Sequence, residues 1–245
     1  MTLSTRVSIQ WPPELAGEDT KTLILTSPNG HFVDIRIFKD KLPFVPGPEV
    51  PFFADVFEWC MTGKEVEIPN TNSISFPHVI DSHAIAKSIS QGQPLEDGEA
   101  DVGHFFSIPG SDDRKETGSM TNLATGKVQD YVEIWRSLDP LTHSPDHEVR
   151  QVKGGAPVPV CVLEVVENVQ YQGTLIKYGN WIQGLIYDKS DDKVPLHVIQ
   201  RYCPENGTEQ TVIEFGDIKL FPLDFKTELD EVLVVKENLC WKRIE

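Results

Sequence analysis

The chain has 245 residues, with 38 Asp or Glu against 22 Lys or Arg, so its formal net charge is −16. This acidity argues against nucleic acid as a partner, because phosphate binding depends on clustered basic side chains. It argues equally against an anionic membrane surface. Hydrophobic residues make up 39% of the chain and aromatic residues 9%, which is typical of a globular protein with enough core to fold without disulfides or metals.

The N-terminal residues 1–13 lack the uninterrupted apolar segment of a secretory signal, and no apolar run approaches membrane-spanning length. The four cysteines are widely spaced and include no C-x-x-C pair, which fits neither a disulfide framework nor a zinc site. We therefore expect a cytoplasmic protein with no bound metal, no cofactor and four free thiols, at Cys60, Cys161, Cys203 and Cys240.

Short strands dominate the first half of the chain. Residues 5–11 alternate in polarity, and residues 22–38 predict a hairpin around a Pro- and Gly-containing turn. The second strand of this hairpin places Asp34 and Arg36 on one face, because residues two apart on a strand point to the same side. Such a pair is either an ion pair that stabilises the strand or a polar anchor inside a cavity.

Two further segments of the first half carry candidate site residues. The aromatic segment 52–62, with Phe57 and Trp59, favours a strand from Val56 onward. The segment 75–83 favours a strand with Asp81 and His83 on one face and His78 on the other, followed by a polar loop over residues 86–101. A His two residues from an Asp suits general acid–base chemistry, although a His at a loop edge more commonly bonds to the backbone.

The stretch 118–140 is the most informative part of the chain. It predicts a hairpin over residues 120–128, because Asn and Gly tolerate the backbone of a tight turn. The following strand places Tyr131, Glu133 and Trp135 on one face. A carboxylate between two large aromatic side chains suggests a strand that lines a cavity. The alternative is an exposed face with an ordinary Glu.

The second half also reads as strands, one of which carries Trp181 on a face with Gln183. Many short strands with weak helical periodicity predict an all-β fold of two small antiparallel barrels or sandwiches in tandem. The Pro-, Gly- and charge-rich segment 141–156 is the predicted linker between an N-terminal barrel, residues 1–140, and a C-terminal barrel, residues 157–245.

Four runs of sequence resemble a family of fungal proteins known as casein-kinase-1-interacting proteins. They are Thr5–Trp11, Leu25–Arg36, Gly118–Val128 and Tyr178-Gly-Asn-Trp-Ile-Gln-Gly184. The resemblance implies two lipocalin-like β-barrels in one chain and a protein kinase as a partner, but no settled reaction.

Two segments depart from that family pattern. Glu58-Trp-Cys-Met-Thr-Gly63 stands where the family tends to carry a Trp-Ala-Phe-Ala-Gly-like run, and Pro77–His83 lacks a Trp that the family tends to have there. Smaller side chains would enlarge a cavity in the first barrel. A diverged member of the family that is adapted to its own ligand would need such departures. It would resemble the dehydratases and hetero-Diels–Alderases of natural-product pathways.

Two functional hypotheses follow. The first is a cofactor-independent enzyme that carries out dehydration, hetero-Diels–Alder cycloaddition or both on a small apolar organic molecule, in a mostly apolar pocket of the first barrel. The second is a non-enzymatic protein that binds a kinase of the casein-kinase-1 type. The predicted catalytic residues are Arg36, His83, Glu133 and Tyr131, and the predicted ligand-binding residues are Asp34, Phe57, Trp59, His78, Asp81, Trp135 and Trp181.

Overall fold

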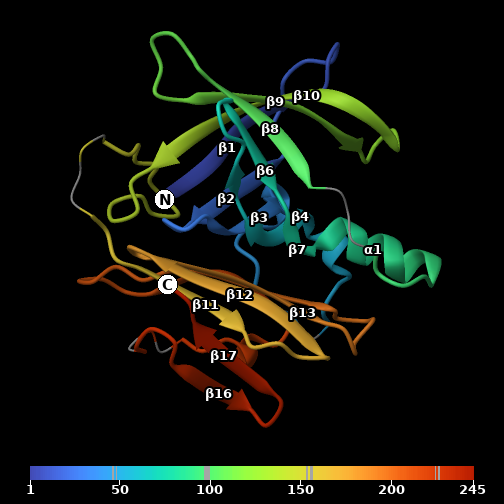
Figure 1. The fold of residues 1–245 in the computed structure, drawn as a ribbon, viewed down its shortest axis with the longest axis vertical. Helices are drawn as coiled ribbons and strands as arrows, with labels where there is room; N and C mark the ends of the chain where they lie inside the picture. Colours follow the sequence, from blue (N-terminus) through green and yellow to red (C-terminus); the bar gives the residue numbers. More distant parts are fainter. Residues whose placement is uncertain are drawn as a thin grey trace.

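The computed structural model describes residues 1–45, 47, 49–96, 100–152, 154, 157–223, 225 and 227–245. These residues form two antiparallel sheets, the first in the upper and the second in the lower part of Figure 1. The first sheet has the order β5-β6-β8-β9-β10-β1-β2-β3-β4-β7. Its strands are β1 (Thr2–Gln10), β2 (Thr20–Thr26), β3 (His31–Phe38), β4 (Phe57–Lys64), β5 (Val66–Glu67), β6 (Ser73–Phe76), β7 (His78–Asp81), β8 (Asp101–Ser107), β9 (Arg114–Asn122) and β10 (Lys127–Leu138).

The second sheet has the order β15-β14-β13-β12-β11-β17-β16. Its strands are β11 (Val160–Val165), β12 (Tyr171–Tyr178), β13 (Trp181–Asp188), β14 (Leu196–Tyr202), β15 (Gln210–Phe215), β16 (Val232–Lys236) and β17 (Leu239–Arg243). The remaining elements are the helix α1 (Ser82–Gln91) and the 3-10 turns η1 (Lys39–Lys41), η2 (Phe53–Asp55) and η3 (Ile218–Leu220). No helix in the described ranges is long and apolar enough to cross a membrane.

The first sheet curls into a barrel, which we call the first barrel. Strands β6 and β7 lie at or near opposite ends of the strand order, yet only Pro77 separates them in the chain. The two edges of the sheet must therefore meet at this residue. Gly63 on β4 makes the meeting possible, because a Cβ atom there would lie 2.1 Å from the carbonyl oxygen of Pro77.

The outer wall of the first barrel is apolar and packs against the second sheet in one hydrophobic core. Aliphatic side chains alternate along β2 and β3 with the side chains that point into the barrel, as the period of two in a strand requires. Members of this shared core include Leu23, Leu25, Val33, Ile35 and Ile37 from the first sheet and Ile176, Leu185, Val198, Ile213 and Phe215 from the second.

The opposite face of the second sheet has an apolar core of its own. Trp241 is fully buried there, and its indole N–H donates to the carbonyl oxygen of Leu220 at 3.0 Å. The edge strand β15 is covered by the first half of the chain, since Phe44 forms a parallel bridge with Ile213. Apolar side chains thus pack on both faces of the second sheet.

One polar side chain joins the two sheets across the shared core. Gln183 is fully buried, and its Nε2 donates to the carbonyl oxygens of Leu23 and Val33, both at 2.8 Å. Its Oε1 accepts a hydrogen bond from Gln200 at 2.5 Å. Since a buried amide is costly unless it is hydrogen-bonded, these contacts fix how β13 sits on β2 and β3.

The predicted all-β, barrel-like class is confirmed, but the prediction for residues 82–91 is wrong, because they form a helix. Helix α1 begins directly after Asp81, whose carboxylate accepts hydrogen bonds from the backbone N–H groups of His83 and Ala84. It ends at Gly92, whose φ of +61° is the left-handed value that favours glycine after a helix. Residues 97–99 of the predicted loop lie outside the described residues.

The segment predicted as a linker is tied to both sheets where it is described. The side-chain amide of Asn180 donates to the carbonyl oxygen of Leu141 at 2.6 Å, and the indole N–H of Trp181 donates to that of His143 at 3.1 Å. Gln151 donates to Ser137 of β10 at 3.0 Å. Residues 153, 155 and 156 lie outside the described residues, and the division into two domains stays a prediction.

The Gln183 contacts predict a measurable contribution to stability. Gln183→Leu preserves volume but leaves the carbonyl groups of Leu23 and Val33 without these donors, so we expect a loss of about 1–3 kcal/mol in the free energy of unfolding. Urea denaturation followed by circular dichroism measures it. The exposed Gln210 is the matched control, and Gln210→Leu should stay within about 0.5 kcal/mol of wild type. Equal effects of the two substitutions would contradict this role of Gln183.

Candidate functional site

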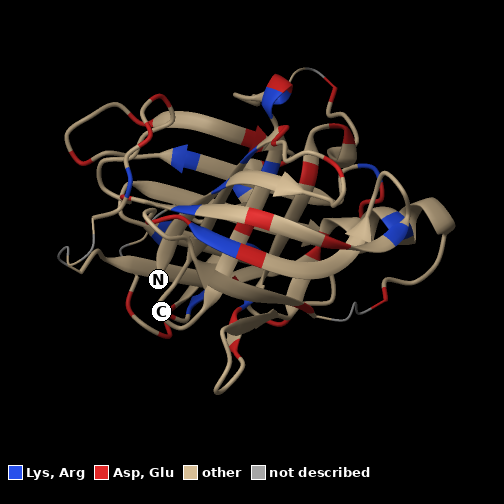
Figure 2. Cartoon of the chain, turned by 90° about the horizontal axis from the view of Figure 1, so that it is seen from above, with Lys and Arg blue, Asp and Glu red and all other residues tan. Residues whose placement is uncertain are grey.

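The interior of the first barrel contains a cavity of about 80 Å³. One water molecule needs about 10–15 Å³ on the same measure, so the cavity has room for several waters or for part of a small organic molecule. Its apolar wall is mostly aromatic and includes Phe32, Trp59, Phe76, Phe105 and Trp135. Its polar lining includes both acids and bases, and Figure 2 shows charged positions on strands in the middle of the molecule as well as in the loops.

Successive side chains of a strand point to opposite faces, so every second side chain along these strands points into the cavity. Tyr131, Glu133 and Trp135 of β10 are buried and line the cavity. Asp34 and Arg36 of β3 are also buried and line it. The expectation that these two strands line a cavity therefore agrees with the geometry.

A single carboxylate holds two buried arginines at the centre of the barrel. Oε1 of Glu133 lies 2.8 Å from Nη1 of Arg6 and 3.6 Å from Nη1 of Arg36. Arg36 also donates from Nε and Nη2 to Oδ2 of Asp34, at 3.0 and 2.8 Å. All four side chains are less than one-tenth exposed. Burial alone would lower the pKa of Arg36, but the carboxylate of Asp34 outweighs it and keeps the pKa above its usual value.

Arg6 and Arg36 have further partners that fix their positions. Arg6 contacts Glu18 and Glu58, both at 2.6 Å. The guanidinium carbon of Arg36 lies 5.0 Å from the centre of the Trp59 ring and 5.8 Å from that of the Trp135 ring. Cation–π contacts at these distances are favourable, more so when they are desolvated. Both indoles therefore pack against one charged group.

A second acid in the cavity forms no ion pair with any described residue. Glu116 on β9 is buried, and its Oε1 accepts the hydroxyl hydrogen of Tyr131 at 2.9 Å. Burial, together with the repulsion of Glu133, raises the pKa of Glu116 to about 8. Glu116 is therefore mainly a neutral carboxylic acid at neutral pH.

Two glycines make room for Glu116 and Tyr131. A Cβ atom on Gly103 would lie 2.2 Å from Oε1 of Glu116, and a Cβ atom on Gly118 would lie 2.6 Å from the hydroxyl oxygen of Tyr131. Both glycines lie within strands, β8 and β9. They are needed for space, so the barrel wall is hollowed where these two side chains lie.

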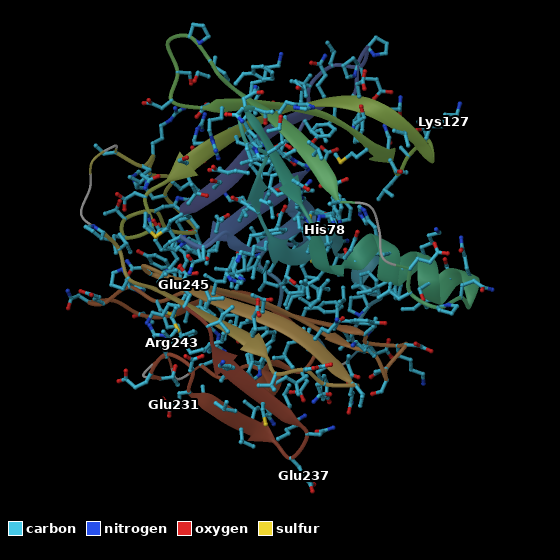
Figure 3. All side chains as sticks on the ribbon, in the orientation of Figure 1. His78, Lys127, Glu231, Glu237, Arg243 and Glu245 are labelled. Atoms are coloured by element: carbon cyan, nitrogen blue, oxygen red, sulfur yellow. The ribbon has the colours of Figure 1, made fainter. Side chains whose placement is uncertain are left out.

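His78, at the lower end of the first barrel beside the start of α1, lies at the cavity boundary (Figure 3). Its Nδ1 is 3.4 Å from Oδ2 of Asp81, and Oδ1 of Asp81 accepts the indole hydrogen of Trp59 at 2.9 Å. Burial alone would raise the pKa of Asp81, but these two partners lower it to about 2. Asp81 therefore holds Trp59 as an ionised hydrogen-bond acceptor.

An open groove of about 660 Å³ adjoins the cavity where β8 diverges from the end of β9. Asp101 and Tyr131 line both the groove and the cavity. The ring of Tyr131 also contacts the edge of Trp11, with ring centres 6.1 Å apart. These shared residues place the groove next to the cavity.

The structure brings most of the predicted site residues together. Asp34, Arg36, Trp59, His78, Tyr131, Glu133 and Trp135 all line the cavity. Asp81 lies just behind this lining, between Trp59 and the start of α1.

Three predicted positions are corrected. His83 belongs to the first turn of α1, and it stacks on Trp59, with ring centres 4.4 Å apart, while its Nε2 contacts the carbonyl oxygen of Glu58 at 2.7 Å. Phe57 and Trp181 belong to the core between the sheets. Phe57 packs on Phe215. Their strands are buried on both faces, so alternation alone could not tell the core from the cavity.

Glu116, Ser4, Asp101 and Arg114 also line the cavity, although the sequence reasoning did not select them. A signal for Glu116 was present, because Arg114, Glu116, Gly118 and Met120 alternate along β9. It was missed because the hairpin was predicted to begin only at residue 120, whereas β9 begins at Arg114.

The shared carboxylate gives a stability prediction. Glu133→Gln removes the charge that compensates Arg6 and Arg36, so we expect a loss of about 3–5 kcal/mol in the free energy of unfolding, as for a broken buried ion pair. Urea denaturation at neutral pH measures this loss. Glu148, whose pair with Arg136 is solvent-exposed, is the matched control, and Glu148→Gln should cost at most about 1 kcal/mol. A similar small cost for both variants would be inconsistent with a central role of Glu133.

The raised pKa of Glu116 gives a pH prediction. Its carboxyl titrates near 4.5 when unperturbed and near 8 when folded, so between these values the folded protein binds more protons than the unfolded chain. Stability falls with rising pH under that condition. The contribution is complete below about pH 4.5 and is lost towards about pH 8. Relative to Glu116→Gln, wild type should therefore lose unfolding free energy between about pH 5 and pH 8 in urea titrations, and a constant difference would contradict the shift.

Comparisons with known proteins place the chain in a family. A model described as "Protein HRI1" matches residues 2–245. Proteins HRI1 of Candida glabrata and Kluyveromyces lactis are each 26% identical to this chain; the alignments cover 94% and 100% of it and 93% and 98% of theirs. The crystal structure of the uncharacterized protein YLR301w from Saccharomyces cerevisiae aligns with a TM-score of 0.75 at 21% identity, over 100% of this chain and 98% of that one, which supports the fold alone. The match extends over nearly the whole sequence, and the chain therefore belongs to the HRI1 protein family.

Proposed function

We propose that the first barrel binds a small, mostly apolar organic molecule and moves a proton on it without a cofactor. The observation that carries the proposal is Glu116, a buried acid that faces an aromatic-walled cavity and has a pKa of about 8. An acid with this pKa is roughly nine-tenths protonated at neutral pH. General acid catalysis is most effective when the pKa lies near the working pH.

The same cavity supplies a group that can accept a proton. Asp34 is paired with Arg36 through Oδ2 only, and its Oδ1 accepts no hydrogen bond from any described residue. Burial raises the pKa of Asp34, which makes the carboxylate a stronger base than an exposed Asp. A donor and an acceptor that line one cavity are the parts that an elimination needs.

Dehydration of an alcohol is the reaction that uses both groups. Glu116 gives its proton to the hydroxyl oxygen, the C–O bond breaks, and water leaves. Asp34 takes a proton from the neighbouring carbon, and the C–H electron pair becomes the second bond of the new C=C. Asp34 then releases its proton and Glu116 regains one through solvent, so the protein is unchanged.

A hetero-Diels–Alder cycloaddition needs fewer of these parts. The rings of Trp59 and Trp135, held by Arg36, would orient two reacting π systems, which lowers the entropic cost of bringing them together. Glu116 would donate a hydrogen bond to the heteroatom and draw electrons from it. The kinase-binding alternative concerns the outer surface of the protein and stays a prediction, as does the cytoplasmic location.

The proposal is tested with a metabolite extract of Candida glabrata cells, incubated with the purified protein and followed by mass spectrometry. We expect a compound to be consumed and a product lighter by one water, or an isomeric product, to form. Glu116→Gln keeps the shape but cannot donate the proton, so its rate should fall about 10²–10⁴-fold.

Glu148→Gln is the control for this experiment, because Glu148 is half-exposed and pairs with Arg136 outside the cavity. Circular dichroism should show that both variants are folded. Conversion at the wild-type rate by Glu116→Gln would rule out its role as the acid. A complete lack of protein-dependent conversion in such extracts would argue against an enzyme.

A further inference from the structure

Two buried oxygen atoms in the cavity lining form no hydrogen bond with any described residue. They are Oδ1 of Asp34 and Oγ of Ser4, and the two residues are only 2% and 3% exposed. Buried polar atoms are normally hydrogen-bonded. Both residues line the cavity, so a polar group of a bound molecule can supply the partner that each atom lacks.

The two atoms belong to one row across the barrel wall. In the sheet register, Ser4 of β1 lies opposite Ile24 of β2, Ile24 lies opposite Asp34 of β3, and Asp34 lies opposite Met61 of β4. The two polar residues are therefore two strand spacings apart, about 9–10 Å between backbones. The apolar side chain of Ile24 separates them along the row.

The charges around the row favour a cation. Besides the neutral Glu116, the cavity lining holds the acids Asp34, Glu65, Asp101 and Glu133, against the bases Arg36, Arg114 and His78. Arg36 is already taken up by Asp34 and Glu133. Burial raises the pKa of Glu65 and Asp101 as well as that of Asp34, because desolvation disfavours the charged form of each carboxyl group.

We propose that the molecule bound in this cavity carries a protonated amine whose N–H donates to one lone pair of Oδ1 of Asp34, while the second lone pair of this oxygen stays available to accept a proton from carbon. The hydroxyl of Ser4 then binds a second polar group at the far end of the molecule, and the apolar body between them lies over Ile24. The inference rests on the proposed function, because it names the class of molecule that the same cavity takes.

Other ligand charges fit this lining less well. A carboxylate near Oδ1 of Asp34 would be repelled by Asp34 and Glu133, because the neighbouring guanidinium of Arg36 already pairs with both of them. A neutral alcohol can donate to Oδ1 of Asp34, but it leaves the excess of negative charge in place. Charge-assisted hydrogen bonds are roughly twice as strong as neutral ones, so the cavity should discriminate between an amine and an alcohol of the same shape.

The test compares three probes of similar shape: 2-phenylethylamine, 2-phenylethanol and 3-phenylpropanoate. Binding is measured by the fluorescence of Trp59 and Trp135, which line the cavity, and by titration calorimetry. We expect the amine to bind at least about tenfold more tightly than the alcohol, and the carboxylate to bind most weakly. Asp34→Asn should remove the preference for the amine, whereas the control Asp55→Asn, at an exposed position of η2, should keep it.

A second variant keeps the test decisive if Asp34→Asn does not fold. Ile24→Trp fills the space between Ser4 and Asp34, so it should abolish amine binding, whereas binding at an outer surface would persist. Equal or tighter binding of the alcohol or the carboxylate in the cavity overturns the amine inference but leaves the proposed function standing. If no probe binds to wild type, or if Ile24→Trp changes nothing, both the inference and the cavity as the ligand site are overturned.

Discussion

The cavity of the first barrel depends on one buried carboxylate, Glu133, which two arginines share. Without it, Arg6 and Arg36 would be buried with too little negative charge around them, and burying an unpaired charge is costly. With it, Arg36 stays in place beside both Trp59 and Trp135, and the two large rings pack on its guanidinium. The ionic network therefore keeps open a space that apolar side chains would otherwise fill.

A barrel with this many charges inside contributes little apolar burial from its interior. The missing stabilisation comes from its outer wall, where Leu25 and Ile35 pack into the core shared with the second sheet. Gln183 fixes the alignment of the two sheets with two hydrogen bonds to backbone carbonyl groups. The two faces of β2 and β3 thus have different roles: the outer face stabilises the fold, and the inner face is free to carry polar side chains for a ligand.

Local alternation was enough to predict which side chains of β3 and β10 share a face, because the period of a strand is a property of a few consecutive residues. It was not enough where both faces of a strand are buried. Trp181 lies in the intersheet core and Trp59 in the cavity, although both alternate in the same way. His83 was misplaced because Asp81 caps helix α1. The short polar segment around Asp81 did not reveal this role. The position of Glu116 depends on Gly103, which comes from a different strand, so the sequence around Glu116 could not show it.

The environments of Glu116 and Asp34 differ in a way that assigns them different chemical roles. Both carboxyl groups are buried, and burial raises both pKa values. Asp34 has the guanidinium of Arg36 against one oxygen, which favours its ionised form, whereas Glu116 has a tyrosine hydroxyl and the nearby charge of Glu133. In the proposed function, the carboxylate that pairs with a guanidinium is the proton acceptor and the uncompensated carboxylic acid is the proton donor. This assignment follows from where the barrel places its arginines, since Arg36 pairs with Asp34 and no described cation forms an ion pair with Glu116.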